Sequence, residues 1–146
     1  MLKIDIIVAG RLRPSPLLEL WNDYTARMQW QINLHEIESK NTADLETKLL
    51  DKIKNEAFTI VLDERGKSLS SRDFAVKLDN LMAEGQSHIQ FIIGEADGLP
   101  KTVKQNANFL LAFGIQTWPH MLVRIMLIEQ IYRAQQILAG HPYHRD

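Results

Sequence analysis

The chain has 146 residues, of which 45% are hydrophobic and 24% are charged, and its formal net charge is −1. These values are those of one globular domain that is long enough to bury a core without a metal or a disulfide. The sequence contains no cysteine, which excludes a disulfide framework and any metal site with cysteine ligands.

The first predicted element is a buried strand over Lys3–Ala9. Its apolar run is short and is interrupted by Asp5, whereas a signal peptide needs a longer apolar body and a cleavage site of small residues. No other apolar run reaches the roughly 18 residues of a membrane-spanning helix. We therefore expect a cytoplasmic protein that makes no contact with membranes.

Short β-rich runs then alternate with helical patterns along the chain. Strands are predicted at Gln31–Ile37, Ala57–Asp63 and Ile89–Ile93, with a short one near Leu110–Gln116. Apolar residues at helical spacing predict helices between them, over Pro16–Met28, around Leu45–Ile53, and over Ser71–Glu84, which opens with a Ser-x-x-Asp capping signal. This alternation predicts an α/β domain with a mainly parallel sheet.

The last helical pattern starts at Pro119, stops at Gly140 and is apolar on nearly every face. Such a helix must bury more than one face. The sheet can cover one side, and a second copy of the chain is the simplest cover for the other, so we expect a homodimer. A fully enclosed core helix is the alternative. Arg124 and Glu129 interrupt the apolar pattern and need polar partners.

Three glycine-containing loops follow predicted strand ends, the place where open α/β sheets bind ligands. They are Leu62–Lys67, Ile93–Pro100 and Gly114–Pro119. None has the G-x-G-x-x-G or P-loop pattern of a nucleotide-phosphate site. The carboxylates of Glu95 and Asp97 favour a ligand with a positive centre over a pyrophosphate.

The sequence closes on HPYHRD, which places two histidines, a tyrosine and an arginine within six positions. A helical zinc pair has i, i+4 spacing, whereas His141 and His144 are three apart around Pro142, so we expect no metal. Without a cysteine or a Gly-x-Ser-x-Gly elbow, the tail is left with acid–base or electrostatic chemistry. The alternative is a tail that only docks across a dimer partner.

Four segments resemble, in order and spacing, the RlmH (YbeA-type) methyltransferases of the SPOUT superfamily: LDERGK, IIGEADGL, WPHMLVRIMLIEQIYRA and GHPYHRD. The resemblance implies one domain over residues 1–146, with an α/β fold, a C-terminal trefoil knot and an obligate homodimer. It implies an S-adenosylmethionine-dependent enzyme that methylates N3 of a pseudouridine in 23S rRNA on assembled ribosomes. The alternatives are another RNA target, such as tRNA, and a non-catalytic dimeric ribosome-assembly factor.

The resemblance also implies roles for individual residues. We expect catalytic roles for Arg133 on the last helix and for Tyr143, His144 and Arg145 in the tail, with Arg145 stabilising negative charge and His144 or Tyr143 assisting removal of the N3 proton. Glu95 replaces a usual second glycine of the family and Trp118 a usual leucine. The cofactor contacts implied by position are Leu62, Gly94, Glu95, Gly114, Ile115, Gln116, Thr117, Trp118 and Pro119.

Overall fold

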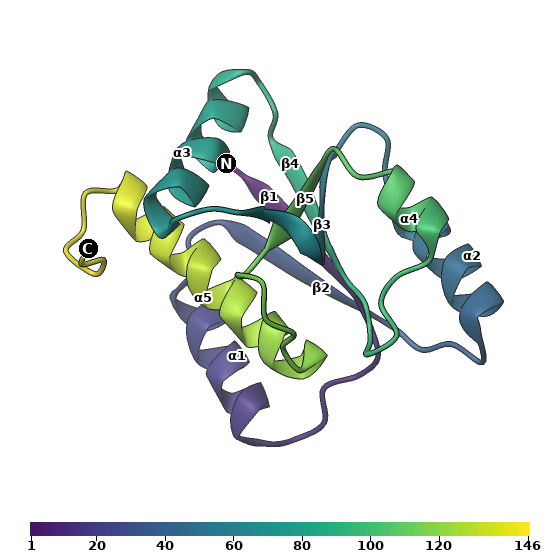
Figure 1. Ribbon diagram of the computed structural model, residues 1–146. Helices are drawn as coiled ribbons and strands as arrows, with labels where there is room; N and C mark the ends of the chain where they lie inside the picture. Colours follow the sequence, from purple (N-terminus) through teal and green to yellow (C-terminus); the bar gives the residue numbers. More distant parts are fainter.

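The computed structural model describes residues 1–146 as five parallel strands between two layers of helices (Figure 1). The strands are β1 (Lys3–Ala9), β2 (Gln31–Ile37), β3 (Phe58–Ser68), β4 (His88–Ile93) and β5 (Phe109–Ala112). The helices are α1 (Pro16–Arg27), α2 (Thr42–Lys52), α3 (Ser71–Ala83), α4 (Lys101–Gln105) and α5 (His120–Leu138). The strand order is β2-β1-β4-β3-β5, and every neighbouring pair is parallel. The predicted α/β class and parallel sheet are therefore confirmed.

The two faces of the sheet carry separate apolar cores because neighbouring side chains of a strand point to opposite faces. Ile4 and Ile6 of β1 lie in the larger core, which α1, α3 and α5 complete. Ile7 and Ala9 of the same strand lie in a smaller core under α2 and α4. A strand buried on both faces reads as a continuous apolar run, which explains why β1 was recognisable.

Helix α5 lies between α1 and α3 and crosses the sheet (Figure 1). Arg124 on this helix is 1% exposed, and its guanidinium donates to Glu36 at the end of β2 over 2.7 Å and to the Gly10 carbonyl over 3.4 Å. The predicted need of Arg124 for a polar partner is thus met within the chain. No helix of the structure is both long and apolar enough to span a bilayer.

A second polar contact joins α5 to the start of the chain. The side-chain oxygen of Gln135, which is 4% exposed, accepts hydrogen bonds from the backbone N–H groups of Gln29 (2.7 Å) and Trp30 (3.1 Å). These two peptide groups form the connection between α1 and β2, where no regular ladder could satisfy them. A helix of the C-terminal third therefore fixes the position of an N-terminal turn.

Two predicted strand ends were wrong. β3 does not stop at Asp63 but runs to Ser68, with a register shift between Leu62 and Lys67, so the first predicted loop is an irregular part of a strand. Gly66 permits this pairing, because a Cβ there would stand 2.6 Å from the backbone of Leu110 in β5.

The last strand is shorter than predicted, and one helix was missed. β5 ends at Ala112 instead of reaching Gln116, because the chain turns at Gly114 with a φ of +83°. α4 has five residues and a single buried side chain, Val103. Its sequence therefore lacks the repeated apolar residues that predict a helix. The predicted cap of α3 is present, with Ser70 accepting from the backbone N–H of Asp73 over 3.0 Å.

Candidate active site

The C-terminal tail folds back on the protein because α5 ends in a left-handed turn. Gly140 has a φ of +72°, its N–H donates to Ile137, and the N–H of His141 donates to Gln136. This pair of bonds is the Schellman motif, which satisfies the last carbonyls of a helix and reverses the chain. The turn brings Tyr143 and His144, which are partly buried, against α5, while Arg145 and Asp146 stay exposed.

The carboxylate of Glu129 on α5 is the centre of the resulting cluster. One of its oxygens accepts from Nε and Nη2 of Arg133, over 2.8 Å and 2.7 Å, and from the Tyr143 hydroxyl over 3.3 Å. The guanidinium of Arg133 also lies 4.8 Å from the centre of the Tyr143 ring. Glu129 is thus a polar residue with partners, as predicted, and it joins two of the expected catalytic residues.

His144 extends the cluster to the end of the chain. Its Nδ1 lies 3.0 Å from Nη1 of Arg133, and its Nε2 lies 2.9 Å from Oδ1 of Asp146. A guanidinium can only donate, so Nδ1 must be the acceptor and Nε2 must carry the proton. Asp146 is in turn bound by Nε of Arg72 on α3, at 2.8 Å from each carboxylate oxygen.

The pKa of Tyr143 is raised well above its ordinary value. Burial is the main cause, and the nearby Tyr24 hydroxyl and Glu129 carboxylate reinforce it by disfavouring a phenolate. Tyr143 is therefore a neutral hydrogen-bond donor in this arrangement. Arg145, the remaining tail residue of the expected set, is exposed and makes no hydrogen bond or ion pair within the chain.

The loop between β5 and α5 is held in part by the side chains of Ser68 and Glu64, neither of which is among the predicted site residues. The Gly114 N–H donates to Ser68 over 3.1 Å, and the Thr117 hydroxyl donates to Glu64 over 2.7 Å. The indole N–H of Trp118 turns back to the carbonyl of Phe113 over 2.9 Å. The irregular end of β3 thus anchors this loop. The polar side chains of that end were the feature of the sequence that could have indicated this contact.

The same loop leaves its own backbone donors free. The peptide N–H groups of Ile115, Gln116 and Thr117 donate no hydrogen bond within the chain. The side chain of Ile115 is 95% exposed and that of Trp118 is 38% exposed. Such a segment can offer both backbone hydrogen bonds and apolar surface to a flat heterocyclic ligand.

The loop after β4 is built around a close backbone approach. A Cβ on Gly94 would stand 2.8 Å from the Leu99 side chain and 3.0 Å from the Gly98 backbone, so only glycine fits without displacing the turn. The Gly98 N–H closes that turn by donating to the Glu95 carbonyl over 2.8 Å. The Glu95 carboxylate reaches across to Gly10 at the end of β1, 3.1 Å from where a Cβ would be.

A cleft of about 310 Å³ connects the β5–α5 loop with the tail cluster. Gly114 lies on one side, and Met126 and Glu129 of α5 lie on another. Leu62 and Gly94 do not line this cleft; the Glu95 carboxylate lies instead near Gly10 and Met121, in the first turn of α5. Of the predicted site residues only Gly114 lines this cleft; Arg133 and Tyr143 contact Glu129, which also lines it, and the second predicted loop lies beside the start of α5. No group of three His, Cys, Asp or Glu side chains is arranged to hold a metal ion.

Comparison with known proteins identifies the family. The family model described as "Predicted SPOUT methyltransferase" matches residues 2–144. The chain belongs to the SPOUT methyltransferase family. The resemblance seen in the four sequence segments is thereby confirmed.

Relatives of this SPOUT chain match it from end to end. "Ribosomal RNA large subunit methyltransferase H" of Rhodospirillum centenum is 47% identical, and the match covers 99% of each chain. The protein of the same name from Zymomonas mobilis is 42% identical, also over 99% of each. A solved structure, a probable methylase family protein from Haemophilus influenzae Rd KW20, has a TM-score of 0.59 and 12% identity, covering 98% of this chain and 70% of its own. That likeness shows a shared fold.

Proposed function

We propose that the protein methylates N3 of a pseudouridine in 23S rRNA, with S-adenosylmethionine as the methyl donor. The observation that carries the proposal is the full-length similarity to ribosomal RNA large subunit methyltransferases H, at 47% identity for the relative from Rhodospirillum centenum. The four expected catalytic residues belong to or adjoin one cluster, next to the cleft that Gly114 lines. This juxtaposition supports the proposal.

The residues around the two loops suit the proposed cofactor. The free peptide donors of residues 115–117 and the apolar surface of Trp118 fit an adenine ring. The carboxylate of Glu95 suits a cationic centre. When bound, S-adenosylmethionine supplies an electrophilic methyl group on a positively charged sulfur.

The tail and α5 supply the rest of the chemistry. N3 of the uracil ring must lose its proton, which places negative charge on the ring carbonyls; that charge would be neutralised when the methyl group passes to N3 and its bond to sulfur breaks. Arg133 and the unpaired Arg145 are the donors that stabilise this charge. His144 is the proton acceptor, since Tyr143 is held neutral, and it becomes available when the base displaces the Arg133 bond at Nδ1.

The proposal includes an assembly. Leu122, Val123 and Met126 on α5 are only partly covered, and Trp118 lies exposed beside them in sequence, which supports a homodimer through this helix. A dimer of this kind would bring each tail near a partner's cofactor loops. The C-terminal trefoil knot and the single domain over residues 1–146 belong to the same proposal.

The charge of the chain supports the ribosome as substrate. With a net charge of −1, the protein has little general attraction for naked RNA, so recognition of an assembled particle is favoured. A ribosomal substrate implies a cytoplasmic location.

The decisive experiment uses 70S ribosomes from a strain that lacks the modification. Incubation with the protein and S-adenosylmethionine is expected to add one methyl group, which mass mapping of nuclease fragments locates on a pseudouridine of 23S rRNA. Methylation of tRNA alone would replace the proposed substrate. Failure to bind S-adenosylmethionine at millimolar concentration in calorimetry would point to an assembly factor.

A further inference from the structure

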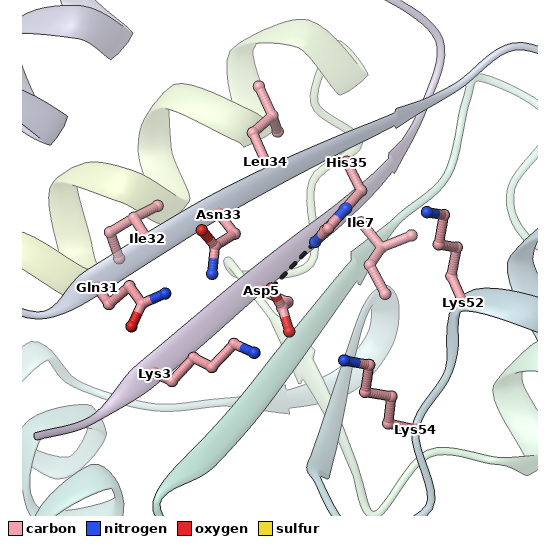
Figure 2. A pocket seen from close by; sticks show the side chains of 10 residues that line it. All are labelled: Lys3, Asp5, Ile7, Gln31, Ile32, Asn33, Leu34, His35, Lys52 and Lys54. Atoms are coloured by element: carbon pink, nitrogen blue, oxygen red, sulfur yellow. Dashed lines mark hydrogen bonds and ion pairs between the residues drawn. The ribbon is translucent and has the colours of Figure 1, made fainter.

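A second cleft, of about 610 Å³, lies on the face of the sheet that carries α2 and α4. Those helices cover Ile7, Ala9 and Ile37 toward the carboxyl ends of the strands. The amino-terminal halves of β1 and β2 are left uncovered on this face and form the floor of the cleft (Figure 2). Its lining residues are Lys3, Asp5, Ile7, Gln31, Ile32, Asn33, Leu34, His35, Lys52 and Lys54.

The charged side chains of this cleft are three lysines and one aspartate. Lys3, Lys52 and Lys54 line it, and none of them belongs to an ion pair within the chain. Figure 2 shows their side chains extending around the open space above Asp5. This excess of positive charge is local to the cleft, since the chain as a whole carries a net charge of −1.

The single carboxylate of the lining does not offset the lysines. The side chain of Asp5 is 7% exposed, and its two oxygens are bound by Nε2 of His35 at 3.0 Å and Nε2 of His88 at 2.5 Å. These contacts use both carboxylate oxygens inside the protein. An incoming anion would therefore meet the lysines and the His35 ring before it met the negative charge.

The floor also presents hydrogen-bonding groups without partners. Gln31, Asn33 and His35 alternate along β2, an edge strand of the sheet, and so point to the same face. The side-chain amides of Gln31 and Asn33 make no hydrogen bond within the chain. One wall is fixed from below, because the fully buried Gln90 binds both the N–H (3.2 Å) and the carbonyl (3.0 Å) of Lys54.

A sheet face that no helix covers is exposed to water, and this exposure alone accounts for the presence of amide and charged side chains on it. It does not explain why three unpaired cations gather around one carboxylate whose two oxygens already have hydrogen-bond partners. A polyanion that also offers hydroxyl and base-edge hydrogen bonds matches both the lysines and the free amides. We propose that this cleft docks the phosphodiester backbone of rRNA, on the opposite face of the sheet from the tail cluster. The inference rests on the proposed function and adds a second RNA contact to it.

Binding of fluorescently labelled full-length protein to undermethylated 70S ribosomes tests the inference. Affinity is measured between 50 and 200 mM KCl for the wild type and for Lys52→Gln/Lys54→Gln. The matched control is Lys40→Gln/Lys101→Gln, which removes the same charge from exposed lysines that lie outside the cleft and outside any ion pair. Circular dichroism and thermal unfolding confirm that all three proteins fold alike.

The cleft variant is expected to bind on the order of tenfold more weakly at 100 mM KCl, with its salt slope smaller by roughly 0.7 to 0.9 per lysine. The control should stay within about twofold of the wild type, because its lysines contact no phosphate. Equal effects in the two variants, or an unchanged salt slope, would overturn the inference. So would loss of ribosome binding with unchanged binding to protein-free 23S rRNA, which would assign the cleft to a ribosomal protein.

Methyl transfer by the same samples separates this inference from the proposed function. If the wild type methylates ribosomes while the cleft variant binds like the control, only the docking site is wrong. If the wild type binds with the expected salt dependence but transfers no methyl group, the proposed function fails and the docking site stands. A wild type that does not bind ribosomes contradicts both.

Discussion

Nη1 of Arg133 lies 3.0 Å from Nδ1 of His144, while Nε and Nη2 of the same guanidinium bind the carboxylate of Glu129. Because arginine has no acceptor atom, this contact defines which imidazole nitrogen carries the proton. The same contact attaches the C-terminal tail to helix α5. The tail is thus positioned by the residue with which it is expected to share the chemistry.

Replacement of His144 distinguishes proton transfer from positioning. His144→Gln keeps an oxygen that can accept from Arg133 but cannot take up a proton, whereas His144→Ala loses both. If His144 is the proton acceptor, both variants should lower kcat on saturating ribosomes by about 100-fold or more. His141→Gln, at an exposed position of the same tail, should transfer methyl groups at the wild-type rate. Near-normal turnover by His144→Gln would show that the imidazole only positions Arg133.

Removal of Glu36 should leave a buried charge without its partner. Arg124 has a side chain that is 2% exposed, and Glu36→Ala is expected to lower the free energy of unfolding by about 3 kcal/mol. Arg124→Met should cost less, because Glu36 is 28% exposed and water can solvate it. Urea unfolding measures both, and Lys48→Ala, which breaks an exposed pair with Asp44, is the control with little expected change. A larger loss for Arg124→Met than for Glu36→Ala would contradict this order.

The carboxyl of Asp5 should contribute an acid-sensitive part of the stability. Burial by itself would raise its pKa, but hydrogen bonds from His35 and His88 outweigh burial, and the pKa lies below the ordinary value of 3.8. A carboxyl with a lowered pKa stabilises the folded state above its ordinary value and loses that stabilisation as pH falls through the folded value. The difference in unfolding free energy between the wild type and Asp5→Asn is therefore expected to shrink below about pH 4. An unfolding difference that does not change with acid would contradict the assignment.

Glu95 should discriminate between charged and neutral forms of the cofactor. S-adenosylmethionine carries a sulfonium, whereas the demethylated product is a neutral thioether at that atom. Glu95→Gln is expected to weaken binding of the methyl donor about fivefold, equivalent to about 1 kcal/mol, and to leave binding of the product unchanged. Calorimetry measures both ligands, and Asp97→Asn in the same loop is the matched control. Equal weakening of the two ligands would mean that Glu95 acts through the shape of the turn.

The sequence was a good guide to the elements whose burial is regular. β1 and β2 occupy the predicted residues, because β1 is nearly continuously apolar and β2 alternates apolar Ile32 and Leu34 with polar neighbours. The end of β3 was not predictable, since Lys67 and Ser68 return to the sheet through backbone bonds to β5. Polar side chains at these positions do not indicate that the backbone pairs with a neighbouring strand. Helix α4 was not predicted for a related reason, since it buries only Val103.

The candidate site was predictable as a set of residues but not as an arrangement. The resemblance supplied Arg133 and the tail, yet nothing local in the sequence connects Ser68 with Gly114 or Arg72 with Asp146. These contacts join residues that are far apart in the chain, and they depend on the pairing of β3 with β5 and on the packing of α3 against α5. The cleft around Asp5 is of the same kind, because His35 and His88 reach it from two different neighbouring strands.

The bonds from Gln135 to the turn at Gln29 and Trp30 also bear on how the chain is made. During synthesis, α1 leaves the exit tunnel long before the helix that covers its apolar side and satisfies that turn. The larger core cannot close until almost the whole chain has been translated. The nascent protein therefore folds late. Its N-terminal half must stay free of aggregation beside the ribosome until the last helix has been synthesised.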